Sequence, residues 1–257
     1  MAMIYRKIIE SLFKRHYPMK FTYECGYVID PTLKLGKIKR IFLEFMPMSR
    51  YKKKYMVLHF SERIVENPFV IQNIPEDKSI KILEIGCTGG KIVMNLTNLG
   101  YDVYGVDLVD YDYKHPNFTF YKKNFLDCKF ESNTFDVVIL LSVIEHVGLD
   151  VYGNKILDAE GDIKMLREVY RILKPNGKVI LTAPYYGKYE EGPIYRVYDG
   201  KRINKLFELF KSRKYSYYKL ENKLYYANTT KKELDNKKFA RNGGIKGLIC
   251  AIAWKTN

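Results

Sequence analysis

Apolar and polar residues follow two rhythms along the chain, and a regular alternation of the two begins near residue 81. Short apolar runs alternate there with segments in which apolar residues recur every three or four positions. The first rhythm predicts buried strands and the second predicts amphipathic helices. Strands are expected at 82–85, 102–107, 118–121, 135–141 and 178–183, and helices at 91–98 and 162–173.

This alternation predicts the class of fold. The run 135–141 is of the apolar kind that is buried on both faces of a parallel sheet. Two later runs, 215–227 and 248–254, predict antiparallel strands at one edge. Together these elements predict an α/β fold with a doubly wound, mostly parallel, seven-stranded sheet.

The residues ahead of this pattern predict a helical extension. Apolar residues recur at helical spacing over 4–13 with basic residues between them, which predicts an amphipathic basic helix. Such a helix serves as a membrane-surface contact or lid, or it packs on the domain or on a second subunit; the packed helix is preferred. A second helix is expected over 61–74, interrupted by Pro68. The chain therefore divides into an extension, 1–78, and a domain, 79–257.

Composition indicates the cellular compartment in which the protein is expected. The chain has 257 residues, 47% of them hydrophobic, and no apolar stretch of the length that crosses a bilayer. The four cysteines are scattered without C-x-x-C spacing, so neither a disulfide framework nor a zinc site is expected. These features predict a cytoplasmic protein without a metal site, and peripheral contact with a membrane stays open.

Charge leaves two interpretations open. The formal net charge is +15 and the isoelectric point is about 9.4. One interpretation is attraction to nucleic acid or anionic lipid. The other is a general compositional bias toward lysine, isoleucine and tyrosine.

A glycine-rich loop and a later acid predict a nucleoside site. The stretch from Glu84 to Lys91 joins a strand to a helix through three glycines, which let the backbone pass close to a ligand. It matches neither G-x-G-x-x-G nor a P-loop, because Ile92 follows Lys91. Asp107 ends the next strand, where an acid of α/β folds accepts hydrogen bonds from ribose hydroxyls.

The loop Glu84-Ile85-Gly86-Cys87-Thr88-Gly89-Gly90 resembles the E/D-x-G-x-G-x-G loop of class I S-adenosylmethionine-dependent methyltransferases. Thr88 stands where the family has its central glycine. The strand end from Ser142 to His146 resembles the S-x-[IL]-E-H segment of many O-methyltransferases, and the turn at 171–178 resembles the family's R-x-L-K-P-G-G turn. The resemblance covers about 100 residues in the family's order. It implies a Rossmann-like methyltransferase that uses S-adenosyl-L-methionine.

The resemblance also implies which residues hold the methyl donor. They are Glu84, Gly86, Cys87, Gly90, Asp107, Leu108, Asn124, Phe125 and Ser142. The amide oxygen of Asn124 would accept a hydrogen bond from the adenine amino group, and Phe125 would pack on the ring. An ordinary polar loop is the alternative at these two positions.

His146 is the candidate catalytic residue. It is one of four histidines, and imidazole titrates near neutral pH, so it is suited to take a proton from an acceptor hydroxyl. The alternative is that Glu145 and His146 only shape the loop around the methyl donor.

A narrower resemblance concerns the acceptor. Residues 145–153 and 158–162 resemble the E-H-x-G-L-x-x-Y-G…D-x-x-G-D insertion of methyltransferase-like proteins that are associated with polysaccharide assembly. It implies a saccharide or glycan acceptor, including a lipid-linked one. The candidate substrate residues are Tyr152, Asp162, Tyr195 and Arg196. Two alternatives stay open, namely that Asp162 caps the following helix and that the acids of the insertion hold a divalent metal.

The resulting prediction is an enzyme that O-methylates a saccharide hydroxyl. One alternative is an RNA methyltransferase, suggested by the positive charge and the 23 tyrosines. Another is a non-catalytic cofactor-binding protein, suggested by the departures from the family pattern at Thr88 and Asn124. The sequence leaves the oligomeric state open.

Overall fold

The computed structural model describes the strands at 23–29 and 52–58 and the ranges 62–151, 157–221, 225–237 and 246–256. The chain divides into two compact units, Met1–Ser61 and Glu62–Asn257. In the first unit β1 (Tyr23–Ile29) pairs with β2 (Lys52–Leu58) in antiparallel fashion, so the extension contains strands that the sequence did not predict. The amphipathic helix predicted at 4–13 lies outside the described residues.

The second unit is built on an eight-stranded sheet in the order β11-β10-β12-β7-β6-β3-β4-β5. Five strands are parallel, namely β3 (Lys81–Ile85), β4 (Asp102–Asp107), β5 (Phe118–Lys122), β6 (Phe135–Leu141) and β7 (Leu173–Pro184). The antiparallel strands are β12 (Gly247–Trp254), β10 (Ser212–Glu221) and β11 (Tyr225–Thr229). The predicted doubly wound, mostly parallel fold is confirmed. It has one strand more than predicted because the run 215–227 contributes to two strands, β10 and β11.

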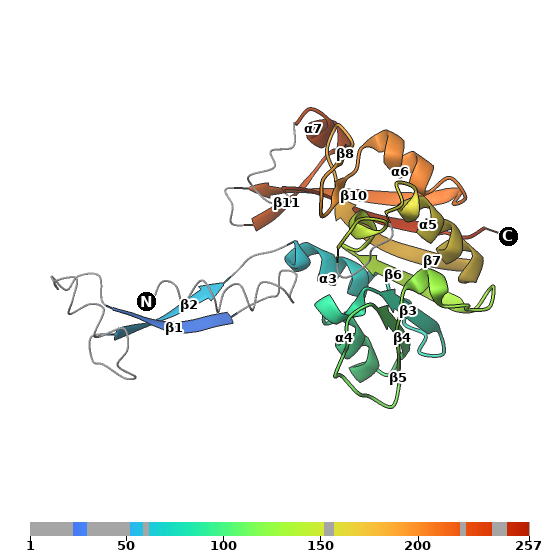
Figure 1. Ribbon diagram of the computed structural model, residues 1–257, viewed down its shortest axis with the longest axis horizontal. Helices are drawn as coiled ribbons and strands as arrows, with labels where there is room; N and C mark the ends of the chain where they lie inside the picture. Colours follow the sequence, from blue (N-terminus) through green and yellow to red (C-terminus); the bar gives the residue numbers. More distant parts are fainter. Residues whose placement is uncertain are drawn as a thin grey trace. The chain divides into compact units, whose positions relative to one another are not determined.

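Helices cover both faces of the sheet (Figure 1). Side chains of α3 (Arg63–Gln72) and α4 (Ile92–Asn98) share one buried cluster with Val137 and Ile139 of β6. Side chains of α5 (Gly161–Ile172) and α6 (Gly200–Leu206) share the other with Val138 and Leu140. Successive residues of a strand point to opposite faces, so β6 joins the two cores. A short helix, α7 (Lys231–Asp235), follows β11.

Helix α3 belongs to the same compact unit as the sheet, although the sequence placed it in the extension. Pro68 lies inside this helix, which continues to Gln72. Within the described ranges, no helix has both the length and the apolar character needed to cross a membrane.

The order of the strands predicts a ligand crevice beyond the carboxyl ends of β3 and β6. The chain enters at β3, runs outward to β4 and β5, and returns to β6 on the other side of β3. The connections after β3 and β6 therefore diverge, and ligands of such folds bind between them, beyond the carboxyl ends of the strands. Two short 3₁₀ helices follow there, η1 (Cys87–Gly89) after β3 and η3 (Ile144–His146) after β6.

Candidate active site

The loop after β3 turns at Gly86, which only glycine fits. Its φ is +73°, and a Cβ built there would lie 2.4 Å from Cγ2 of Val143. The Gly86 N–H donates to the Val106 carbonyl at 2.8 Å, which ties the turn to β4. The next side chain, Cys87, is buried, and burial raises the pKa of its thiol. Cys87 can therefore meet a ligand only through its backbone.

Glu84 anchors the glycine loop from inside the protein. Its side chain is buried, and Oε2 accepts a hydrogen bond from the Val93 N–H of α4 at 3.1 Å. Burial raises the pKa of Glu84 to about 8, although the positive charge of Arg63 opposes the rise. Gly90 closes the loop in an extended conformation, and its backbone passes beside the Glu84 carboxyl. Glu84 thus shapes the loop that would carry the ligand.

Asp107 at the end of β4 is bonded to the glycine loop. Its Oδ2 accepts from the Thr88 N–H at 2.9 Å and from the Thr88 hydroxyl at 2.7 Å, while Oδ1 accepts from the Val109 N–H at 3.1 Å. Thr88 stands where the family pattern has a glycine. It therefore already donates two hydrogen bonds to the carboxylate that is predicted to bind the ribose. A ribose hydroxyl must share this carboxylate with Thr88 or displace it.

The three residues predicted to contact adenine differ in exposure and in the partners of their side chains. Leu108 is 38% exposed beside Asp107, as a residue that packs on a ligand should be. The Asn124 side-chain oxygen accepts from the Leu126 N–H at 3.1 Å and caps η2 (Phe125–Asp127), which is the polar-loop alternative. Phe125 is only 3% exposed and packs in the core, so its ring is not presented to a ligand as predicted.

Ser142 belongs to a buried polar network that the sequence interpretation missed. Its hydroxyl donates to Glu66 Oε1 of α3 at 2.5 Å, and the Thr182 hydroxyl donates to the same oxygen at 2.6 Å. Arg63 donates to Glu66 Oε2 at 2.8 Å and to the Leu141 carbonyl at 2.9 Å. Helix α3 is thereby fixed to the ends of β6 and β7. The only signal in the sequence was the Arg63–Glu66 pair, three residues apart in a predicted helix.

Glu145 and His146 follow on η3. The Glu145 side chain is 1% exposed, burial raises its pKa, and its Oε2 has no hydrogen-bond partner in the described part of the chain. The side chain of His146 is 23% exposed, and its Nδ1 lies 2.5 Å from the Ile194 carbonyl oxygen. Burial lowers the pKa of His146, and the positive charges of Arg63 and Arg196 lower it further, while the hydrogen bond to the Ile194 carbonyl opposes the fall. The imidazole is therefore held neutral at physiological pH.

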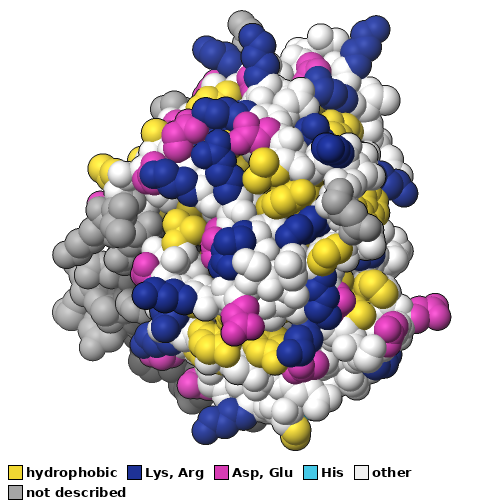
Figure 2. All heavy atoms as spheres, turned by 90° about the vertical axis from the view of Figure 1, so that its right-hand side faces the viewer, with side chains coloured by type: hydrophobic (Ala, Val, Ile, Leu, Met, Phe, Trp, Pro, Cys, Tyr) yellow, Lys and Arg dark blue, Asp and Glu magenta, His cyan; other side chains and the backbone are white. Residues whose placement is uncertain are grey.

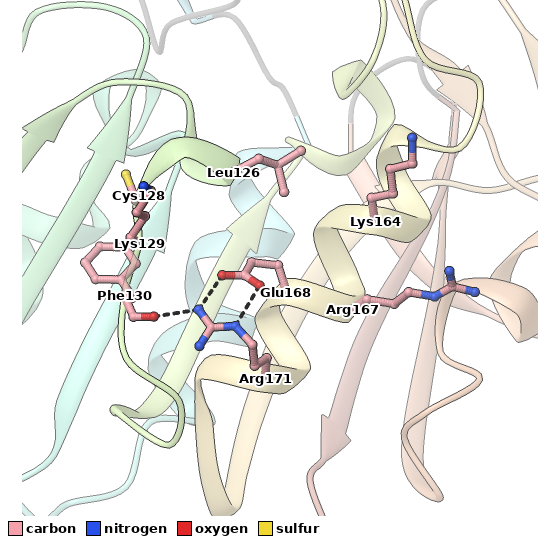
Figure 3. Close-up of a pocket in the computed structure, with 8 residues that line it drawn as sticks. All are labelled: Leu126, Cys128, Lys129, Phe130, Lys164, Arg167, Glu168 and Arg171. Atoms are coloured by element: carbon pink, nitrogen blue, oxygen red, sulfur yellow. Dashed lines mark hydrogen bonds and ion pairs between the residues drawn. The ribbon is translucent and has the colours of Figure 1, made fainter.

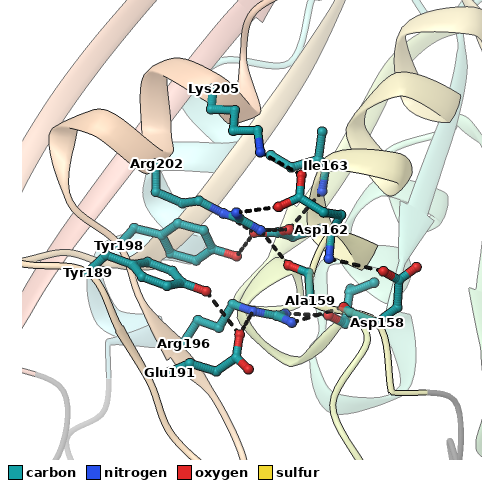
Figure 4. A network of polar contacts seen from close by, with 12 residues as sticks. Asp158, Ala159, Asp162, Ile163, Tyr189, Glu191, Arg196, Tyr198, Arg202 and Lys205 are labelled. Carbon is teal, nitrogen blue, oxygen red and sulfur yellow. Dashed lines mark hydrogen bonds and ion pairs between the residues drawn. The ribbon is translucent and has the colours of Figure 1, made fainter.

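Two of the predicted substrate residues are built into a polar network inside the protein (Figure 4). Arg196 is fully buried and donates to Glu191 Oε2 at 2.8 Å and to the Val147 and Asp158 carbonyls. These bonds hold the insertion after η3 against the short hairpin of β8 (Glu190–Glu191) and β9 (Arg196–Val197). The guanidinium thus faces its own chain, and acceptor contact by Arg196 stays a prediction.

Asp162 is the second member of this network. It is buried, pairs with the guanidinium of Arg202 on α6, and lies 3.2 Å from the Tyr198 hydroxyl. It does not cap α5 as the alternative proposed, because the helix begins one residue earlier and Glu160 is its N-cap. Tyr195 is partly exposed on the hairpin, and Tyr152 lies outside the described residues. Acceptor contacts by Tyr195, Tyr152 and Asp162 stay predictions.

A shallow groove of about 700 Å³ lies between the residues around η2 and helix α5 (Figure 3). Three of its four basic side chains have acidic partners: Arg171 pairs with Glu168, Lys164 with Asp158, and Arg167 with Glu208. None of the predicted site residues lines it. The candidate active site is therefore set by the residues beyond the carboxyl ends of β3, β4 and β6 and not by this groove.

Comparison with known proteins gives the class. Residues 83–181 match the family described as "Methyltransferase domain". The structure superposes on a SAM-dependent methyltransferase from Archaeoglobus fulgidus with a TM-score of 0.54 at 17% identity, covering 76% of this chain and 95% of the other. A Haemonchus contortus phosphoethanolamine N-methyltransferase in complex with S-adenosyl-L-methionine gives 0.53 at 18% identity, covering 76% and 53%. Residues 83–181 therefore match a methyltransferase domain, and the chain has the fold of S-adenosylmethionine-dependent methyltransferases.

The chain is also similar to a curated protein, the ubiquinone biosynthesis O-methyltransferase of Pelagibacter ubique. The two are 28% identical over 168 residues, which is 60% of this chain and 65% of the relative. A second relative with the same description, from Rickettsia bellii, is 37% identical over 111 residues, 40% of this chain and 41% of the relative. The chain spans less than two thirds of the length of either relative.

The residues of the predicted crevice fit S-adenosyl-L-methionine. The Gly86 turn leaves a backbone cradle that a Cβ could not share, and Asp107 presents a carboxylate beyond it. The exposed apolar side chains of Leu108 and Val109 follow the carboxylate, where they can cover an adenine ring. The loop backbone, Asp107 and Leu108 are thus the residues that would hold the adenosyl group.

Proposed function

We propose that the chain transfers the methyl group of S-adenosyl-L-methionine to a hydroxyl oxygen, with His146 accepting the hydroxyl proton. The bound cofactor supplies a methyl group that is already electrophilic, so the protein has to align the acceptor and remove its proton. The contact between His146 Nδ1 and the Ile194 carbonyl carries this proposal. A carbonyl oxygen only accepts hydrogen bonds, so Nδ1 bears the ring proton and Nε2 bears the lone pair.

The protonation state of His146 suits this role. A base must be unprotonated at working pH, and burial lowers the pKa of His146 from its ordinary value. The neighbouring carboxyl of Glu145 lies 4.0 Å from Nε2, and burial raises its pKa, so it does not hold His146 in the charged form. The names of the two curated relatives, which are O-methyltransferases, support oxygen as the methylated atom.

We infer an acceptor whose hydroxyl sits on an apolar or aromatic body. Ile194, whose carbonyl meets His146, is 55% exposed, and Leu157 next to Asp158 of the insertion is 74% exposed. Asp162 and Arg196, which were expected at sugar hydroxyls, are occupied by internal hydrogen bonds. A saccharide acceptor therefore has less support, and it now rests on Tyr152 and Tyr195.

An acceptor panel tests this inference. The protein is incubated with labelled S-adenosyl-L-methionine and, separately, with a prenylated catechol, an oligosaccharide and an RNA transcript. Label is expected on the catechol, and Ile194→Asp is expected to raise the KM for it because the change places a charge beside an apolar acceptor. Lys188→Asp, on an exposed residue of the same connection, is the control. Label found only on the oligosaccharide or the RNA contradicts the inferred acceptor.

The RNA alternative has little support from the surface that Figure 2 displays. On that face lysine and arginine side chains are dispersed among acidic and hydrophobic ones and form no continuous basic stripe. A nucleic-acid site is expected to gather cations along a groove or face. The membrane alternative concerns the predicted helix at 4–13, outside the described residues, and stays a prediction.

A further inference from the structure

Three residues of the β8–β9 hairpin and of the position after it form hydrogen bonds with η3 or with the residue that follows η3. The Ile194 carbonyl accepts from His146 Nδ1 at 2.5 Å. The Tyr198 hydroxyl donates to the Ile144 carbonyl at 3.0 Å. Between these two, Arg196 donates to the carbonyl of the residue after His146. The Arg196 and Tyr198 side chains, two residues apart, thus reach backbone carbonyls of η3 and of the residue after it, and the Ile194 backbone contacts the His146 ring.

Arg196 makes the most side-chain hydrogen bonds of these three residues. Its side chain is fully buried, and its planar guanidinium reaches three acceptors at once: the Glu191 carboxylate and the carbonyls of Val147 and Asp158 (Figure 4). A buried guanidinium with several fixed partners holds them in one geometry, because its donors lie in a rigid plane. Its removal would leave two carbonyls without this donor and release the hairpin from the insertion.

We propose that Arg196 is a positioning residue, whose bonds to Glu191, Val147 and Asp158 hold the Ile194 carbonyl on His146 Nδ1 and so select the imidazole tautomer that accepts the substrate proton. This inference rests on the proposed function of His146. It adds that the hairpin, which follows the residues matched by the methyltransferase family, acts as the orienting group of the base. In acid–base sites, the hydrogen bond made by one ring nitrogen decides which nitrogen carries the proton.

The tautomer can be measured without an acceptor, by nitrogen-15 NMR of protein labelled at histidine. The signal of His146, assigned by its loss in His146→Gln, is expected to show a protonated Nδ1 and a pKa below about 6.5. In Arg196→Met the proton is expected to move to Nε2 in most molecules, because the Ile194 carbonyl no longer holds it on Nδ1. Arg167→Met, which breaks the exposed pair with Glu208, is the control and should change neither value.

A second variant separates positioning from the loss of charge and from misfolding. Arg196 itself lowers the pKa of His146, as does Arg63 from α3, so Arg196→Met removes a like charge as well as an anchor. Glu191→Ala keeps the arginine and removes only its carboxylate anchor, which is 41% exposed. It should move the tautomer in the same direction by a smaller amount and lower the pKa of His146, because the hydrogen bond to the Ile194 carbonyl raises that pKa. Glu208→Ala is its control.

Two outcomes decide the proposal. If Glu191→Ala and any folded Arg196→Met protein keep the wild-type tautomer and pKa of His146, the hairpin does not position the base. If Arg196→Met fails to fold, Glu191→Ala decides alone. Because the readout is independent of turnover, unimpaired activity in His146→Gln would overturn the proposed function and leave the measured tautomer as a separate result.

Discussion

Replacing His146 with glutamine is expected to lower the rate of methyl transfer by about 10²- to 10⁴-fold, the range usual for loss of a general base. Glutamine can occupy the same space and donate to the Ile194 carbonyl, but it cannot take up a proton. Binding of the cofactor should be unchanged, because glutamine keeps the bond to the Ile194 carbonyl and the glycine loop is held by Glu84, Val106 and Asp107. Steady-state rates with labelled methyl donor, measured over a range of pH, check both expectations.

The pH profile identifies the group responsible. The wild-type rate is expected to rise with pH as His146 loses its proton, through a pKa below about 6.5, because burial lowers the pKa of the imidazole. This limb should be absent in His146→Gln. His115→Gln is the matched control, because His115 lies in the connection before β5 and its Nδ1 accepts from the Asn117 N–H. A His146→Gln enzyme with the wild-type rate and profile would show that the base is another group.

Gly86→Ala is expected to destabilise the protein and to abolish cofactor binding. The left-handed backbone alone costs about 1–2 kcal/mol for an L-residue. The new Cβ would also overlap Cγ2 of Val143 at 2.4 Å, and a β-branched side chain cannot rotate away freely. Thermal unfolding measures the first effect, and calorimetric titration with S-adenosyl-L-homocysteine measures the second.

Two further variants separate the causes. Gly100→Ala carries a similar positive φ of +89° with no atom within 4 Å of its Cβ, so it reports the backbone cost alone. Val143→Ala combined with Gly86→Ala removes the overlap and should recover the difference between the two alanine variants. If Gly86→Ala is as stable as Gly100→Ala and binds the ligand normally, the loop does not form the close-fitting cradle described above.

The fold was largely predictable because its signals are local. Apolar runs separated by amphipathic stretches set the parallel sheet, and the order of strands follows from short, right-handed connections. The eighth strand was missed because the run 215–227 carries tyrosines along its whole length, in the part that forms β10 and in the part that forms β11. The place of α3 was missed because nothing in its own sequence says that Glu66 bonds to Ser142 and Thr182, which are 76 and 116 residues away.

The site residues whose identity is required by backbone geometry were predictable from the sequence. The residues whose role depends on side-chain contacts between distant segments were less predictable. Gly86 needs its left-handed φ, and Asp107 ends its strand as the spacing predicts. Arg196 and Asp162 were predicted as substrate contacts from the resemblance to a family, which does not say which side chains they pair with. Here they are buried and pair with Glu191 and Arg202, which only the folded chain brings near.

The most direct test of the account is calorimetric titration of the protein with S-adenosyl-L-methionine and S-adenosyl-L-homocysteine. One molecule of either ligand is expected to bind per chain, and Asp107→Ala should abolish binding, whereas Asp110→Ala, at an exposed acid paired with Lys122, should not. Thr88→Val, which removes the hydroxyl from the Asp107 carboxylate, should retain binding. No heat from either ligand, or undiminished binding by Asp107→Ala, would contradict the cofactor site and would favour a protein that has kept the fold without the chemistry.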